Sequence, residues 1–93
     1  MPAVDFKTSD YLNTPEDIAA YLNEVLEEED PKLLMLALRN VADARGGISA
    51  LSEQTGLNRE SLYKTLSGNR NPRIETINMI LHALNLRLSV TAY

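Results

Sequence analysis

Apolar residues recur every three to four positions along most of the chain, a spacing that predicts amphipathic helices rather than a sheet. The first such segment follows Thr14-Pro15, where Thr14 is the expected N-cap and Pro15 takes the first helical position. We expect this helix to end near residues 28–29. Its apolar positions are Ile18, Tyr21, Leu22, Val25 and Leu26.

A second helix is predicted from Asp30-Pro31 to residues 44–45, where Gly46-Gly47 supplies a glycine C-cap. Its apolar side chains lie around most of the helix and include Leu33, Leu34, Leu36, Leu38 and Val41. A helix with this pattern is buried on more than one side. We therefore expect the first helix to cover its second face.

Residues 48–66, ISALSEQTGLNRESLYKTL, predict two short helices joined by a tight turn at Gly56. Ser49 is the expected N-cap of a helix over 50–55, and Asn58 that of a helix over 59–67. Gly56 stands where the turn requires a positive φ, and Ser52 is small where the two helices cross. Leu51, Leu57, Leu62 and Leu66 are placed for apolar contacts. This is the helix-turn-helix pattern, whose second helix lies in the major groove of double-stranded DNA.

The C-terminal quarter predicts a polar, basic loop over 69–73, a fifth helix ended by Asn85, and a short strand over 86–91. A lone strand leaves its backbone groups unpaired, so it should pair with another chain or with the N-terminal segment. We expect a homodimer with Leu86, Leu88 and Val90 near the interface.

The expected fold is therefore all-α, a five-helix helix-turn-helix of the phage-repressor type with a short C-terminal β-strand. Residues 1–29 form an N-terminal extension and helix for partner binding, and residues 30–85 form the DNA-binding domain. Residues 86–93 form the strand for dimerisation.

The net charge of −4 hides an asymmetry between the two halves of the chain. Residues 1–44 carry three basic and ten acidic residues, whereas residues 45–93 carry six basic and three acidic residues. Such an asymmetry suggests two kinds of partner. The basic C-terminal half can bind phosphates, and the acidic N-terminal half can bind a basic protein.

The outer face of the helix over 59–67 carries the candidates for reading bases, which are Arg59, Glu60, Tyr63 and Lys64. Arginine and lysine can bind guanine, and glutamate can accept from the cytosine amino group. Glu60 can instead pair with Lys64 at i and i+4, and the whole face can simply be a solvated polar surface. The candidates for holding phosphates are Ser49, Asn58, Asn69, Arg70, Asn71 and Arg73.

We expect no enzymatic activity, no metal and no cofactor. The chain has no cysteine, and its single histidine, His82, has no second ligand at metal-binding spacing. No glycine-rich phosphate loop and no serine–histidine–acid arrangement is visible. No apolar run approaches the roughly 20 residues of a membrane span, and no secretory signal is apparent, so we expect a cytoplasmic protein.

From Leu33 to Leu84 the chain resembles the Xre family, the Cro and phage-repressor type of helix-turn-helix domain, through SALSEQTGLNRESLYKTLSGNRNP. The whole chain, from DYLNTPEDIAAYLNEVLEE to LHALNLRLSV, is similar to the addiction-module antidote family of HigA-like antitoxins. The resemblance implies an antitoxin of a type II module that neutralises a small RelE/HigB-type ribonuclease toxin. It also implies repression of its own operon, alone or with the toxin.

RelE-like toxins bind RNA and are basic, so the acidic N-terminal third would be complementary to such a partner. The candidates for toxin binding are Phe6, Asp10, Tyr11, Leu12, Glu16, Asp17 and Tyr21. The acidic residues can also be a solvated face, and Tyr21 can be a core residue. Two other functions stay open: a stand-alone phage-type repressor whose N-terminal part serves dimerisation, and an interaction module that has lost DNA binding.

Overall fold

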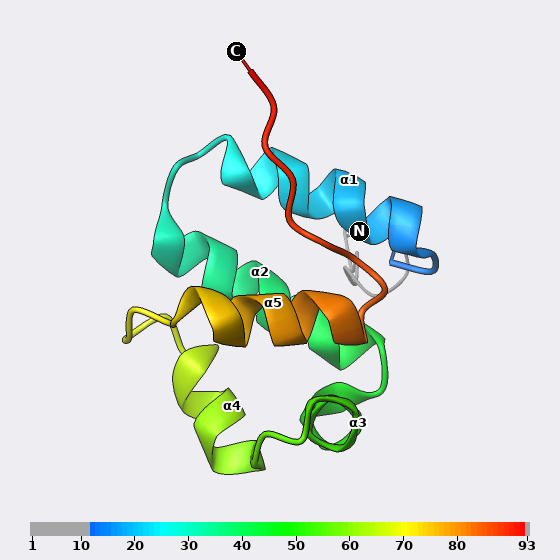
Figure 1. The fold of residues 1–93 in the computed structure, drawn as a ribbon, viewed down its shortest axis with the longest axis vertical. Helices are drawn as coiled ribbons and strands as arrows, with labels where there is room; N and C mark the ends of the chain where they lie inside the picture. The colour runs from blue at the N-terminus through cyan, green and yellow to red at the C-terminus, as the bar shows by residue number, and fades with distance from the viewer. Residues whose placement is uncertain (1–11, 93) are drawn as a thin grey trace, which may run out of the picture.

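Five helices account for the regular structure of residues 12–92, the part of the chain that a computed structural model describes (Figure 1). They are α1 (Pro15–Leu26), α2 (Pro31–Ala44), α3 (Gly47–Thr55), α4 (Arg59–Thr65) and α5 (Ile74–Ala83). The predicted all-α class and the predicted order of the helices are confirmed. In Figure 1, α1 lies at one end of the molecule and α3 and α4 lie at the other.

Side-chain caps begin α1 and α2 as the sequence predicts. The Thr14 hydroxyl accepts from the Asp17 N–H at 3.0 Å, and the Asp30 carboxylate accepts from the Lys32 N–H at 3.0 Å. Each bond satisfies one of the backbone donors that the first turn of a helix leaves free. The end of α1 differs from the prediction, because the helix stops at Leu26 and residues 27–29 form a turn.

The start of α3 corrects one prediction, because Ser49 is not its N-cap. The helix begins at Gly47, with Gly46 as N-cap at φ 104° and no side-chain cap bond. Gly46 adopts a left-handed conformation that carries the chain from α2 into α3 within two residues. Ser49 therefore lies inside the first turn of α3, where its side chain is exposed.

Hydroxyl groups and one glycine close the turn between α3 and α4. Gly56 has φ 81°, as predicted. The Ser52 hydroxyl donates to the Leu57 carbonyl at 2.6 Å, and the Thr55 hydroxyl accepts from the Leu57 N–H at 3.1 Å. The turn thus holds α4 at a defined angle to α3 through short-range bonds.

We expect Gly56→Ala to destabilise the protein by about 1–2 kcal/mol, because a Cβ is disfavoured by that amount in the left-handed region. A Cβ built at Gly56 meets nothing within 4 Å, so the cost arises from φ and not from a clash. In a domain of this size each kcal/mol lowers the melting temperature by about 4–8 °C, which thermal unfolding followed by circular dichroism measures. Gln54→Ala, at an exposed position of α3, serves as the control. An unchanged melting temperature for Gly56→Ala would show that the turn does not need this conformation.

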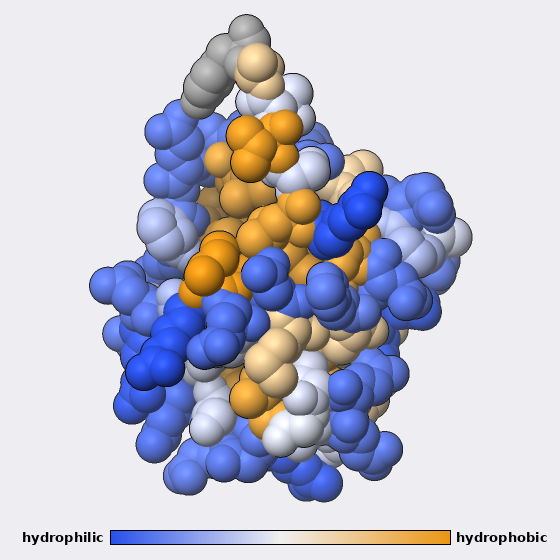
Figure 2. Space-filling view, in the orientation of Figure 1, coloured by the Kyte–Doolittle hydropathy of each residue, from blue (hydrophilic) through white to orange (hydrophobic). Residues whose placement is uncertain are grey.

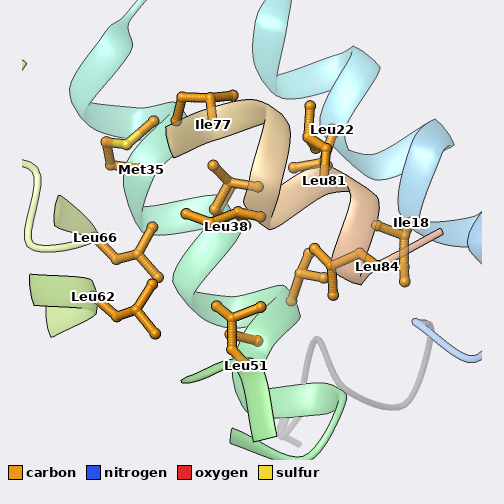
Figure 3. Packing of buried hydrophobic residues seen from close by; sticks show 14 of the residues in the cluster. Ile18, Leu22, Met35, Leu38, Leu51, Leu62, Leu66, Ile77, Leu81 and Leu84 are labelled. Carbon is orange, nitrogen blue, oxygen red and sulfur yellow. The ribbon is translucent and has the colours of Figure 1, made fainter. Parts of the chain in front are cut away.

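The core draws buried side chains from all five helices, as Figure 3 shows. Leu38 of α2 lies between α5 and the leucines of α4, and Leu62 and Leu66 are both fully buried, as predicted for the inner side of that segment. Helix α2 is buried on more than one side, and α1 covers one of its faces, as expected. Leu33 and Leu36 are exposed, since α2 packs against α1 and α3 and leaves this stripe uncovered.

The end of α5 is closed by Asn85 at φ 64°, the left-handed conformation that its sequence predicts. The Leu86 N–H donates to the Leu81 carbonyl at 2.8 Å, and the Asn85 N–H donates to the His82 carbonyl at 3.0 Å, which together form a Schellman motif. Residues 86–92 then leave the end of α5 and pass over α1 as an extended tail (Figure 1). The predicted strand is not formed in this single chain, because within residues 12–92 no neighbouring strand offers hydrogen bonds to the tail.

Candidate functional site

Helix α4 stands at the end of the molecule opposite α1, held by the buried Leu62 and Leu66 (Figures 1 and 3). Its outer face presents Arg59, Glu60 and Lys64 to solvent. Within residues 12–92 the ion pairs are Arg39–Asp43 and Arg73–Glu75, so Glu60 and Lys64 do not pair with each other. The three charged groups of α4 are therefore available to a partner.

Asn58 begins α4 as predicted, and its side-chain oxygen accepts from the Ser61 N–H at 2.7 Å. This bond commits the oxygen to the helix. The amide NH₂ of the same side chain is left as the group that can meet an anion. Asn58 therefore positions α4 in addition to any contact that it makes.

Among the predicted base-reading residues, Tyr63 is the one whose side chain is held in place by a contact with another helix. The guanidinium of Arg39, on α2, lies 4.9 Å from the centre of the Tyr63 ring, and 47% of Tyr63 remains exposed. The Arg39 Nε in turn lies 3.5 Å from a carboxylate oxygen of Asp43. This cation–π contact orients Tyr63 against α2, so part of its ring is not open to a partner. Sequence reasoning missed Arg39, whose i, i+4 spacing to Asp43 was its one short-range signal.

The loop over 69–73, one side of α4 and the start of α5 border an open polar hollow of about 340 Å³. It brings together three of the predicted phosphate-binding residues, Arg70, Asn71 and Arg73. Its walls also include Ser61, Thr65 and Thr76, which sequence reasoning did not single out. Arg73 lies 3.9 Å from Glu75, and both side chains are well exposed, so solvent screens this pair. Asn69 is exposed on the same loop, whereas Ser49 is on α3, outside the hollow.

The candidates for toxin binding fall into three groups. Glu16 and Asp17 are exposed in the first turn of α1, and Tyr21 is half-buried with its hydroxyl accepting from the Asn40 amide at 3.2 Å. Leu12, expected as an apolar anchor for the toxin, is instead a core residue, since it is only 2% exposed and packs in the apolar cluster. The remaining candidates, Phe6, Asp10 and Tyr11, lie outside the described residues.

Residues 12–92 contain no group of three or more histidine, cysteine, aspartate or glutamate side chains that could hold a metal ion. The same residues include no helix that is long and apolar enough to span a membrane. His82 is exposed in the last turn of α5.

The chain is similar to a known protein family and to a known protein. A family model described as "Probable addiction module antidote protein" matches residues 3–92. An uncharacterised protein of Haemophilus influenzae is 41% identical over 86 residues, which cover 92% of this chain and 88% of the relative. No solved structure matches the chain.

Proposed function

The chain belongs to the addiction module antidote protein family, and we propose that it neutralises a RelE/HigB-like ribonuclease toxin and represses its own operon by binding operator DNA. Membership of the family implies a toxin partner of some kind. The class of toxin rests on the resemblance of the whole sequence to HigA-like antitoxins. DNA binding rests on α3 and α4.

The observation that carries the DNA-binding proposal is the exposed, unpaired face of α4 beside a basic loop. An α-helix fits the major groove, and in the helix-turn-helix motif the first turn of the second helix approaches the bases most closely. Arg59 and Glu60 occupy that turn, and Lys64 lies one turn further on. Arg70 and Arg73, on the neighbouring loop, suit contacts with the DNA backbone, which fix position without reading sequence.

The charges on the described surface support two partners at opposite ends of the molecule. The α1 end carries exposed acids and no basic residue between residues 12 and 31, and includes Glu16, Asp17, Glu24, Glu27, Glu28, Glu29 and Asp30. The other end carries Arg59, Lys64, Arg70 and Arg73. The acidic end would repel DNA and attract a basic protein. DNA and toxin would thus bind at different places on the chain.

Fluorescence anisotropy at physiological salt tests the DNA-binding proposal. The probes are a duplex from upstream of the operon and a scrambled duplex of the same composition. Specific binders usually prefer their site by about a thousandfold or more. Equal affinity for the two duplexes would contradict operator binding.

We further propose a two-fold homodimer formed through the tail, with Leu86, Leu88 and Val90 near the interface. Val90 is fully exposed, and the extended tail can form a two-stranded ribbon with a second copy. Dimers of this motif bind half-sites about 34–36 Å apart.

Light scattering should show that the full chain is a dimer and that a chain ending at Leu86 is a monomer. This end point keeps the Leu86 N–H bond that closes α5. A dimer that survives the truncation would remove the tail from the interface.

A further inference from the structure

An apolar groove of about 240 Å³ lies between α1, α2, α5 and the C-terminal tail. Its walls include Leu22 and Leu26 of α1, Leu34 of α2, Leu81 of α5 and Leu88 of the tail. Figure 2 shows apolar side chains gathered on this face, between α5 and the place where the tail passes over α1, with hydrophilic residues around them. Leu26 and Leu88 are each nearly half exposed, so the groove is not closed by the chain itself.

A second hollow of about 250 Å³ continues the groove toward the turn between α1 and α2. It shares Leu26 and Leu34 with the first and is bounded by Glu29, Asp30 and Pro31. Residues 27–30 are four consecutive acids, all exposed, and none of them forms an ion pair within residues 12–92. The groove is therefore mainly apolar, with Asn23, Arg87 and Ser89 also in its walls, and is negative at one end.

An apolar groove with an acidic end indicates what kind of partner can bind in it. An apolar groove takes the apolar face of a helix or extended segment, and the acidic end requires lysine or arginine next to that face. DNA is excluded because its phosphates would meet four carboxylates. A second copy at the groove is disfavoured because its corresponding segment is equally acidic, so the two acidic segments would repel each other across a two-fold contact there. Arg87 also lines the groove, but in the tail rather than at the acidic turn.

We propose that this groove is where the toxin docks, through a segment whose apolar side chains fill the groove and whose basic side chains meet residues 27–30. The identity of the occupant rests on the proposed function. The surface differs from the toxin-binding candidates of the first turn of α1, because it uses the opposite end of α1 together with α2, α5 and the tail.

Two matched pairs of full-length variants test the groove. Leu26→Ser changes a groove residue that is 48% exposed, and Leu36→Ser changes a residue of α2 that is 43% exposed and lies outside the groove. Glu29→Lys reverses a charge at the acidic end, and Glu53→Lys reverses an exposed charge on α3. The probe is the protein encoded by the reading frame adjacent to this one, titrated by calorimetry, with circular dichroism to check folding.

We expect Leu26→Ser and Glu29→Lys each to weaken binding by about tenfold or more, as for residues that dominate an interface. Leu36→Ser and Glu53→Lys should stay within about twofold of the unmodified chain. Added salt should weaken binding by the unmodified chain and do so less for Glu29→Lys. If Leu26→Ser proves unfolded, Glu29→Lys tests alone whether the toxin binds in the groove, because this change removes no packed side chain.

The other outcomes overturn the proposal in distinguishable ways. If the unmodified chain does not bind the protein encoded next to it, that protein is not its toxin. The proposed function and the proposed role of the groove would then both be wrong. Binding by the unmodified chain that Leu26→Ser and Glu29→Lys leave unchanged would overturn the groove alone. Equal losses from Leu26→Ser and Leu36→Ser would also overturn it. Conversion of a dimer to a monomer by Leu26→Ser, seen by light scattering, would assign the groove to a second copy.

Discussion

Replacing Arg59 and Lys64 together with alanine should strongly weaken specific operator binding and leave the fold intact. Both side chains are exposed on α4 and make no ion pair within residues 12–92. Each good contact to a base is worth about 1–3 kcal/mol. If the two losses add, affinity for the operator falls by about 2–6 kcal/mol, roughly 30-fold to 10⁴-fold. Anisotropy with the upstream and scrambled duplexes measures both the loss and the remaining preference.

Arg70→Ala is the matched control for this double variant, because Arg70 lies on the loop and not on α4. If Arg70 binds phosphate, Arg70→Ala should weaken binding to both duplexes alike. It should also reduce the slope of log affinity against log salt concentration by about one. Rescue of cells from the toxin should survive the Arg59 and Lys64 changes, since these residues lie far from the acidic end. An operator affinity that the double variant retains in full would place the DNA-reading surface elsewhere.

Much of the fold could be predicted because its determinants are local. Thr14, Asp30 and Asn58 cap the helices that follow them, and each cap bond spans two or three residues. Gly56 and Asn85 adopt the left-handed conformations that their residue types favour. Signals of this range are visible in the sequence itself. They predict the starts of α1, α2 and α4, the turn after α3 and the end of α5.

Features that depend on distant contacts could not be predicted. Arg39 and Tyr63 lie on different helices, and periodicity does not show which residues of two helices meet. Leu12 lies outside any helix, so no helical periodicity indicates that it is buried in the core. The alternation over 86–91 predicts a strand, but a strand also needs a neighbour to receive its hydrogen bonds. The groove arises only where four separate elements meet.

The core suggests how far the two functions can be separated. The expected division at residue 29 assigns partner binding to the N-terminal part and DNA binding to the rest. Yet Ile18 and Leu22 of α1, and Leu12 before it, are buried in the same cluster as Leu38 and Leu81. If DNA binding and toxin capture occupy opposite ends of one core, point variants of the full chain will separate them better than truncation.

A chain that begins at Asp30 should therefore lose its cooperative thermal transition. Burial of a leucine or isoleucine side chain stabilises a protein by about 1.5–3 kcal/mol, so removal of Leu12, Ile18 and Leu22 costs about 4.5–9 kcal/mol. Domains are typically stable by only about 5–15 kcal/mol. Within the full chain, Ile18→Ala should cost about 2–5 kcal/mol, whereas Glu24→Ala, exposed on the same helix, should stay within about 0.5 kcal/mol. Thermal unfolding by circular dichroism measures all three variants. A cooperative transition of the shortened chain near that of the full chain would show that residues 30–93 form a domain of their own.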